Sequence, residues 1–139
     1  MDLPFAETVN YWKSGQSSLG AILDKAHSII ERLGGIVTMK AEGIENGRAA
    51  FLLDFYFADE RFRCIWPVLP TRKGGNELAA KRQAATLLFH DIKAKSLKCS
   101  IFGPRVAFFE YILLENGQTI VQMNNYELIE YLPKQLKSG

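Results

Sequence analysis

Positively charged residues gather in one part of this chain. Between residues 60 and 105 the sequence holds ten Lys or Arg against three Asp or Glu, although the whole chain has a formal net charge of only +2. Such a block attracts anions, which include phosphate groups, nucleic acid and acidic proteins. The candidate contacts to nucleic-acid phosphates are Arg61, Arg63, Arg72, Lys73, Lys81, Arg82, Lys93, Lys95 and Lys98.

Two of these arginines alternate with aromatic residues along the segment 61–66. If the segment is a strand, Arg61 and Arg63 share one face, and Phe62 and Trp66 share the other. Cations that contact a sugar–phosphate chain and rings that stack on bases are the components of a single-strand binder. When Phe62 and Trp66 face the core, however, only the arginines are left for a ligand. A charged surface that serves solubility alone is the competing interpretation.

A short loop before an expected helix is a second candidate for anion binding. Arg72 and Lys73 are followed there by Gly74, Gly75 and Asn76. Backbone amides, glycines and two cations at the start of a helix can hold a phosphate. The loop matches neither the P-loop nor the dinucleotide-binding pattern. A solvated surface loop is therefore the simpler interpretation.

Patterns typical of catalysis or metal binding are weak in this sequence. His27 and His90 are its only histidines, and none of the residues around them gives the ligand spacing that zinc requires. The chain has no nucleophile elbow and no recognisable Cys–His pair. We therefore assign no catalytic residue, no metal ligand and no cofactor, and an enzyme is the least favoured class. A deep pocket with one of the histidines beside a carboxylate would revive that class.

The elements that must position these residues follow from hydrophobic spacing and turn residues. Asn46-Gly47 and Asn116-Gly117 are typical of tight hairpin turns, because both central positions can adopt positive φ. The predicted elements are, in order, a helix over 18–33, strands over 36–41, 49–57 and 61–66, a helix over 77–99, strands over 106–114 and 119–123, and a helix from 124 or 125 to about 132.

These elements define an α+β fold: a helix, a three-stranded antiparallel meander, a long helix packed on the sheet, a β-hairpin and a short C-terminal helix. We expect an N-terminal arm over 1–16 and a single α+β domain over 17–139, since the length fits one domain. Hydrophobic residues make up 47% of the chain and aromatic residues 12%, which excludes a disordered protein.

The sequence also predicts the compartment. Its apolar runs are too short to span a bilayer, and the N-terminus lacks the basic start and apolar stretch of a secretory signal. Cys64 and Cys99 could in principle pair, but two cysteines do not make a disulfide framework, and a reducing compartment is the simpler interpretation. We therefore expect a cytoplasmic protein without a membrane partner.

Four stretches of the chain carry a resemblance to known proteins: 30–35 (Ile-Glu-Arg-Leu-Gly-Gly), 61–70, 82–95 and 108–119. Together they resemble a family of small uncharacterised proteins encoded in bacteria, phages and prophages, over roughly residues 17–121. Here Glu-Asn-Gly-Gln at 115–118 replaces the family's commoner Pro-Asp-Gly-Arg turn. The family has no established activity. The resemblance implies an intracellular setting and a link to mobile-element DNA, and it assigns no catalytic residue.

Two classes of function remain. The first is a non-catalytic intracellular binding protein with a basic surface for single-stranded nucleic acid. The second is a protein-interaction or homo-oligomeric structural subunit without nucleic-acid binding, which the aromatic density at 55–57 and 108–109 favours. The first class requires the nine cations to converge in the folded molecule. Dispersed cations paired with carboxylates contradict it.

Overall fold

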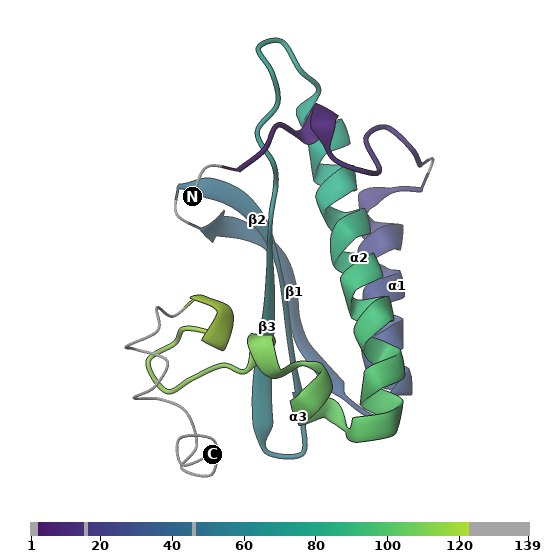
Figure 1. Ribbon diagram of the computed structural model, residues 1–139, viewed down its shortest axis with the longest axis vertical. Helices are drawn as coiled ribbons and strands as arrows, with labels where there is room; N and C mark the ends of the chain where they lie inside the picture. Colours follow the sequence, from purple (N-terminus) through teal and green to yellow (C-terminus); the bar gives the residue numbers. More distant parts are fainter. Residues whose placement is uncertain (1–2, 16, 46, 123–139) are drawn as a thin grey trace.

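The computed structural model describes residues 3–15, 17–45 and 47–122. Figure 1 shows two layers, with a twisted sheet on one side and the helices α1 and α2 on the other. The elements are α1 (Leu19–Arg32), β1 (Ile36–Glu45), β2 (Arg48–Phe57), β3 (Glu60–Pro67), α2 (Glu77–Phe102) and α3 (Pro104–Ala107), with short 3-10 helices η1 (Ala6–Thr8), η2 (Phe109–Tyr111) and η3 (Ile120–Gln122). The α+β class, the meander and the long helix are confirmed.

The three strands pair in the order β1-β2-β3, and both pairs are antiparallel. The hairpin between β1 and β2 turns at Gly47, whose φ of 76° is the left-handed conformation that the Asn-Gly pattern predicts. The register sets Asp54 of β2 opposite Arg63 of β3. Since side chains alternate along a strand, Arg63 and its neighbour Phe62 point to opposite faces of the sheet.

The core lies between the sheet and the two long helices. Phe51, Leu53 and Phe55 of β2 are about 1% exposed, and Leu88 and Ile92 of α2 are fully buried against them. The rings of the buried phenylalanines pack together, for example with 5.3 Å between the ring centroids of Phe55 and Phe62.

The burial of these rings bears on two roles that the sequence suggested for aromatic residues, namely base stacking and protein docking. Phe62 is 1% exposed and Trp66 packs against the same core, so neither ring is free to stack on a base. Phe108 also packs against this cluster, edge to face with Phe55 and stacked on Phe57. The aromatic density of the sequence therefore marks packing rather than a docking surface.

The segment predicted as a strand over 106–114 is mostly helical. Gly103, with φ of 91°, ends α2, and Pro104 starts α3 directly after it. Phe108, at the junction of α3 and η2, is buried together with Tyr111 of η2 and with Ile112, which follows η2.

The predicted final hairpin is wrong except for one bridge, between Leu113 and Thr119 across the Gly117 turn. Ile112 pairs instead with Phe62 of β3, and most of the predicted strand over 119–123 is the 3-10 helix η3. The predicted helix from 124 or 125 to 132 lies outside the described residues. Within the described ranges, no helix is long and apolar enough to cross a membrane.

The N-terminal segment is fastened to α2. Ala6 is fully buried beside Leu69 and Ala80, away from the main core. The Nε2 atom of Gln83 donates to the carbonyl oxygens of Ala6, Val9 and Asn10 at 2.8, 3.0 and 3.0 Å. The two N–H groups of one buried amide are thus shared among three carbonyls of the N-terminal segment, and these bonds attach residues 6–10 to α2.

Replacing Gln83 with Leu will loosen this segment. The substitution removes the amide that bonds all three carbonyls. Ala6 keeps a hydrogen bond from the Val9 amide, and the loss of the Gln83 bonds costs about 1–3 kcal/mol. We expect faster hydrogen exchange and faster proteolysis in residues 3–12, with the sheet amides unchanged. The matched control is Lys98→Gln, an exposed position on the same helix. Equal protection of the segment in Gln83→Leu and wild type contradicts the prediction.

Candidate nucleic-acid interface

The nine predicted cations do not form one surface. Arg61 and Arg63 lie on the face of the sheet away from the helices, because their neighbours Phe62 and Cys64 face the core. Arg82 and Lys93 lie on exposed positions of α2, in the other layer. The two groups are on opposite sides of the two-layer molecule, so no single ligand strand contacts all nine.

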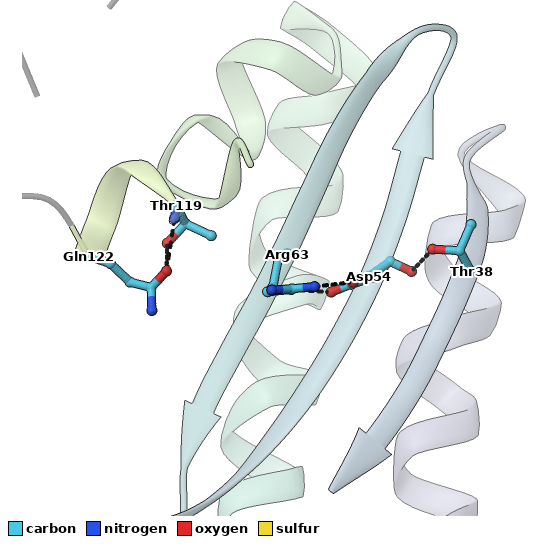
Figure 2. Close-up of polar contacts among 5 residues, drawn as sticks. All are labelled: Thr38, Asp54, Arg63, Thr119 and Gln122. Atoms are coloured by element: carbon cyan, nitrogen blue, oxygen red, sulfur yellow. Dashed lines mark hydrogen bonds and ion pairs between the residues drawn. The ribbon is translucent and has the colours of Figure 1, made fainter. Parts of the chain in front are cut away.

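Arg63 is engaged within the sheet, as Figure 2 shows. Its Nε and one terminal nitrogen each donate to a carboxylate oxygen of Asp54 at 2.8 Å. The Asp54 side chain is 9% exposed, and the hydrogen bond to it raises the pKa of Arg63. The backbone oxygen of Asp54 also accepts from Thr38 Oγ1 at 3.4 Å. Because two nitrogens of the guanidinium group already donate to Asp54, Arg63 is not available for a bidentate contact with a phosphate.

The end of the described chain lies near the same face of the sheet. Gln122 Oε1 accepts from the amide of Thr119 at 2.8 Å and from its hydroxyl at 3.2 Å. Gln122 Nε2 donates to Glu45 Oε1 at 2.9 Å, at the end of β1. The segment after the long helices is thus tied back to the first hairpin by side chains.

The predicted phosphate loop already holds a carboxylate. The backbone amide of Arg72 donates to both carboxylate oxygens of Glu7, at 3.2 and 3.1 Å. The Arg72 guanidinium lies over the ring of Phe5 at 5.8 Å, whereas Lys73 is exposed and has no ion pair within the described ranges. Glu7, from the N-terminal segment, therefore takes the loop donor that a phosphate was expected to use.

Two more of the predicted cations are paired. Lys81 lies 3.3 Å from Glu42 of β1. Lys95 lies 2.9 Å from Asp91 and 2.5 Å from Glu110, and its ammonium group sits over the ring of Tyr111. These pairs join α2 to β1 and to η2, so they hold elements together rather than attract a ligand.

The Lys95 cluster is partly buried, which shifts the pKa values of its members. Burial raises the pKa of Asp91, although the hydrogen bond from Lys95 opposes this. Burial alone lowers the pKa of Lys95, but its bonds to Glu110 and Asp91 outweigh that effect and the pKa is raised. The hydroxyl of Tyr111 donates to the other oxygen of Asp91. The folded protein therefore holds the proton of Lys95 more tightly than the unfolded chain does.

This difference predicts a loss of stability at alkaline pH. The contribution of Lys95 is fully present below its ordinary pKa of about 10.4 and falls as the pH rises through the higher folded value. Lys95→Met will lower the free energy of unfolding by about 1–3 kcal/mol at neutral pH. It will also flatten the alkaline decline above about pH 10, measured by urea unfolding. Parallel declines in variant and wild type contradict the assignment.

A hollow lies between the two long helices. α1 and α2 run side by side in the same direction (Figure 1). Between them is a groove of about 990 Å³, which we call the helix groove. Its apolar part comes from Ile29, Leu33 and Phe89, and its charged part from Asp24 and the cations Lys25, Arg32 and Lys93.

The residues that line the helix groove have a net positive charge. Lys25, Arg32 and Lys93 are exposed, and none of them forms an ion pair with another described residue. The one carboxylate in the lining, Asp24, contacts Lys40 Nζ at 2.5 Å, and this hydrogen bond lowers the pKa of Asp24. Asp24 is thus ionised, and its ion-pair partner is Lys40, which does not line the groove. None of the three groove cations is paired with Asp24.

Of the three groove cations, only Lys93 is among the residues predicted from the sequence. Lys25 and Arg32 share their helix face with Ser28 (i, i+3, i+7), and this spacing could have identified them as one exposed face of α1. What the sequence did not reveal is that this face lies beside Phe89 and Lys93. The two faces meet because α1 and α2 pack side by side in the fold, although all three strands lie between them in the sequence.

Neither histidine forms a catalytic arrangement in the described residues. His27 Nε2 lies 3.2 Å from Glu31, but the pair is on the helix surface, with 28% and 58% of the side chains exposed. His90 stacks on Tyr11 at 4.6 Å between ring centroids. Within the described ranges, no three His, Cys, Asp or Glu residues gather where they could hold a metal ion. Cys64 and Cys99 are buried and free.

The C-terminal end of α2 carries an exposed apolar patch. Leu97, Ile101 and Phe102 are 70%, 66% and 63% exposed, and Val106 of α3 follows them. Leu97 and Ile101 are four residues apart and so lie on one helix face. Four large apolar side chains at one end of the molecule are more than the scattered exposure of an ordinary surface.

The geometry therefore describes a two-layer α+β protein whose candidate site is a basic groove between two parallel helices. Comparisons of the chain with protein-family models, with curated proteins and with solved structures give no match.

Proposed function

We propose that this protein is a non-catalytic binding protein that holds single-stranded nucleic acid in the helix groove, and not on a surface of all nine predicted cations, which are dispersed and partly paired with carboxylates. The observation that carries the proposal is the groove's charge: Lys25, Arg32 and Lys93 are exposed and form no ion pair within the described chain, and the one carboxylate of the lining, Asp24, is ion-paired with Lys40. Cations of this kind attract a phosphate backbone, because binding releases the counterions condensed on it.

The apolar part of the groove supports a single strand rather than a simple anion. Phe89 lies in the lining, and Lys93 Nζ is 5.9 Å from its ring centroid. An aromatic ring next to a cation offers a stacking surface for a base and a charge for the adjoining phosphate. In a duplex the bases are already stacked on one another, so this pair is better matched to a single strand.

Binding of a labelled oligothymidine, measured by fluorescence anisotropy at about 50 and 200 mM salt, tests the proposal. Three phosphate contacts predict a slope of about −2 in log K against log salt, since each contact to a single strand contributes about −0.7. A polyglutamate peptide of the same charge should compete poorly, because it has no bases to stack. Absence of binding at low salt, or binding that ignores salt, overturns the proposal.

Self-association is a second candidate function, and the apolar patch at the end of α2 favours it. A symmetric dimer needs only one self-complementary surface, which two copies of a helix face can supply. Light scattering of wild type and of Leu97→Ser/Ile101→Ser discriminates the two. A wild-type dimer that becomes a monomer in the variant supports self-association, and a wild-type monomer at high concentration rejects it.

The link to mobile-element DNA and the cytoplasmic setting that the sequence suggests stay predictions. Both predictions are consistent with a protein that binds single-stranded nucleic acid.

A further inference from the structure

A second cavity lies beyond one end of the helix groove, between the N-terminal segment and the first turns of α1 and α2. We call it the arm pocket. It has a volume of about 320 Å³, and its lining includes Tyr11, Lys13 and Ser14 of the N-terminal segment and Arg82 and Thr86 of α2. This volume is at the lower limit for pockets that take small molecules.

The arm pocket is positively charged. Lys13 and Arg82 contribute two cations, and its lining contains no carboxylate. Both residues are exposed, and neither forms an ion pair within the described ranges. The first turns of the two helices are already capped, by Ser18 on the amide of Ala21 and by Asn76 on the amide of Ala79. The positive charge therefore comes from the side chains of Lys13 and Arg82 and not from open helix ends.

The position of Lys13 follows from the way the N-terminal segment is fastened. Gln83 holds the carbonyl groups of Ala6, Val9 and Asn10, and Tyr11 then stacks on His90 of α2. These contacts lie immediately before Lys13 in the chain, and both are made by α2 residues that follow Arg82. Two cations from distant parts of the sequence thus meet at one pocket.

The arm pocket continues the helix groove. Ile22 lines the pocket and its neighbour Ala21 lines the groove. On α2, Thr86 lines the pocket and Phe89, about one helical turn later, lines the groove. A strand that lies along the groove can therefore extend its end into the pocket.

We propose that the arm pocket binds the terminal phosphate monoester of the strand whose internal phosphates lie in the helix groove. A phosphate monoester carries a charge of about −1.5 to −2 near neutral pH, whereas each internal phosphate carries a single charge. Two cations without a carboxylate match the terminal group better than an internal one. The hydroxyls of Tyr11 and Ser14 add donors of the kind that phosphate oxygens accept.

The inference rests on the proposed function, and its test separates the two. One oligothymidine is prepared with a 5′-phosphate, with a 3′-phosphate and with hydroxyls at both ends, and the three affinities are compared. We expect one phosphorylated form to bind about tenfold tighter than the hydroxyl form, as one additional charge-assisted contact implies. Equal affinities for all three forms, within about twofold, overturn the inference and leave the groove proposal standing.

Substitutions then locate the effect. Arg82→Gln and Lys13→Asn should reduce the preference to about twofold or less while the hydroxyl-ended strand binds as before. Asn is chosen at position 13 because the backbone there has φ of 52°, which Asn tolerates. Lys73→Gln, an exposed cation outside the pocket, is the matched control and should keep the full preference. A preference that persists in both pocket variants overturns the inference.

A mononucleotide completes the separation. Thymidine 5′-monophosphate and thymidine 3′-monophosphate should raise the melting temperature of wild type more than thymidine does, and less so in Arg82→Gln. If a monophosphate binds through Arg82 but no oligonucleotide binds, the pocket assignment holds and the groove proposal fails. If neither monophosphate shifts the melting temperature and end phosphorylation has no effect on the strand, the pocket assignment fails.

Discussion

Replacing Arg63 with Met will lower the free energy of unfolding by about 3–5 kcal/mol. The guanidinium of Arg63 is the bidentate partner of Asp54, whose side chain is only 9% exposed. Met keeps the length and apolar stem of the side chain, so the main change is the loss of the charge. Removing one partner of a buried pair leaves the other charge uncompensated in a poorly solvated site, and this is the reason for the large effect. Urea unfolding followed by circular dichroism measures it.

The matched control removes both charges. In Asp54→Leu/Arg63→Met no buried charge is left, and replacing a buried ion pair with apolar residues is often neutral or stabilising. We therefore expect the double variant to recover most of the stability lost in Arg63→Met. If the double variant is as unstable as the single one, the effect comes from packing at position 63 and not from the stranded carboxylate.

Reversing two charges in the helix groove will have the largest effect on binding. In Arg32→Glu/Lys93→Glu two of the three groove cations become carboxylates on opposite walls. We expect the affinity for oligothymidine to fall by more than about tenfold at low salt. Loss of two phosphate contacts should also reduce the salt slope by about 1.4. Anisotropy titrations at several salt concentrations provide both quantities.

The control for this prediction has the same net charge but leaves the groove intact. Arg61 and Lys98 are exposed, form no ion pair within the described ranges, and lie outside the groove. Arg61→Glu/Lys98→Glu therefore changes the overall charge by the same amount. It should retain the wild-type salt slope, with only a modest loss of affinity from the weaker long-range attraction. If both double variants lose affinity equally, net charge rather than the groove governs binding.

The elements with strong local signals were predictable from the sequence. α1, β2 and β3 lie close to where the hydrophobic spacing and the Asn-Gly turn indicate. β1 continues to Glu45 beyond the predicted end at 41, and α2 continues to Phe102 beyond the predicted end at 99. α1, α2, β2 and β3 bury apolar residues, whereas no residue of β1 is buried. The pattern defines these elements because each is long or repetitive. The α+β class followed from their order.

The segment 106–114 shows where local patterns fail. Its apolar and aromatic residues suit a strand, and the Asn116-Gly117 turn suits a hairpin. The chain instead turns at Gly103 and Pro104, and Phe108 and Tyr111 are buried from short helical turns. Whether such a run packs as strand or helix depends on the space left by the other elements, and the propensities of its residues do not contain that information.

The candidate site depended even more on tertiary structure. The cation-rich block was visible in the sequence, but Arg63, Lys81 and Lys95 each form an ion pair with a carboxylate at least four residues away. Lys93, from the basic block, lines the helix groove, but the other two groove cations, Lys25 and Arg32, lie outside that block in the sequence. A count of charges along the chain could not reveal these pairings, because the carboxylates that neutralise Arg63 and Lys81 belong to other strands.

The sequence by itself determined which segments are helices and strands and that the middle of the chain is basic, since propensity, spacing and formal charge are local properties. Only the tertiary structure decided which cations remain unpaired and which face each other. Coulomb attraction depends on distance in space and on solvent exposure rather than on distance along the chain. The parallel packing of α1 against α2, which no local pattern encodes, is what brings Arg32 and Lys93 to one groove.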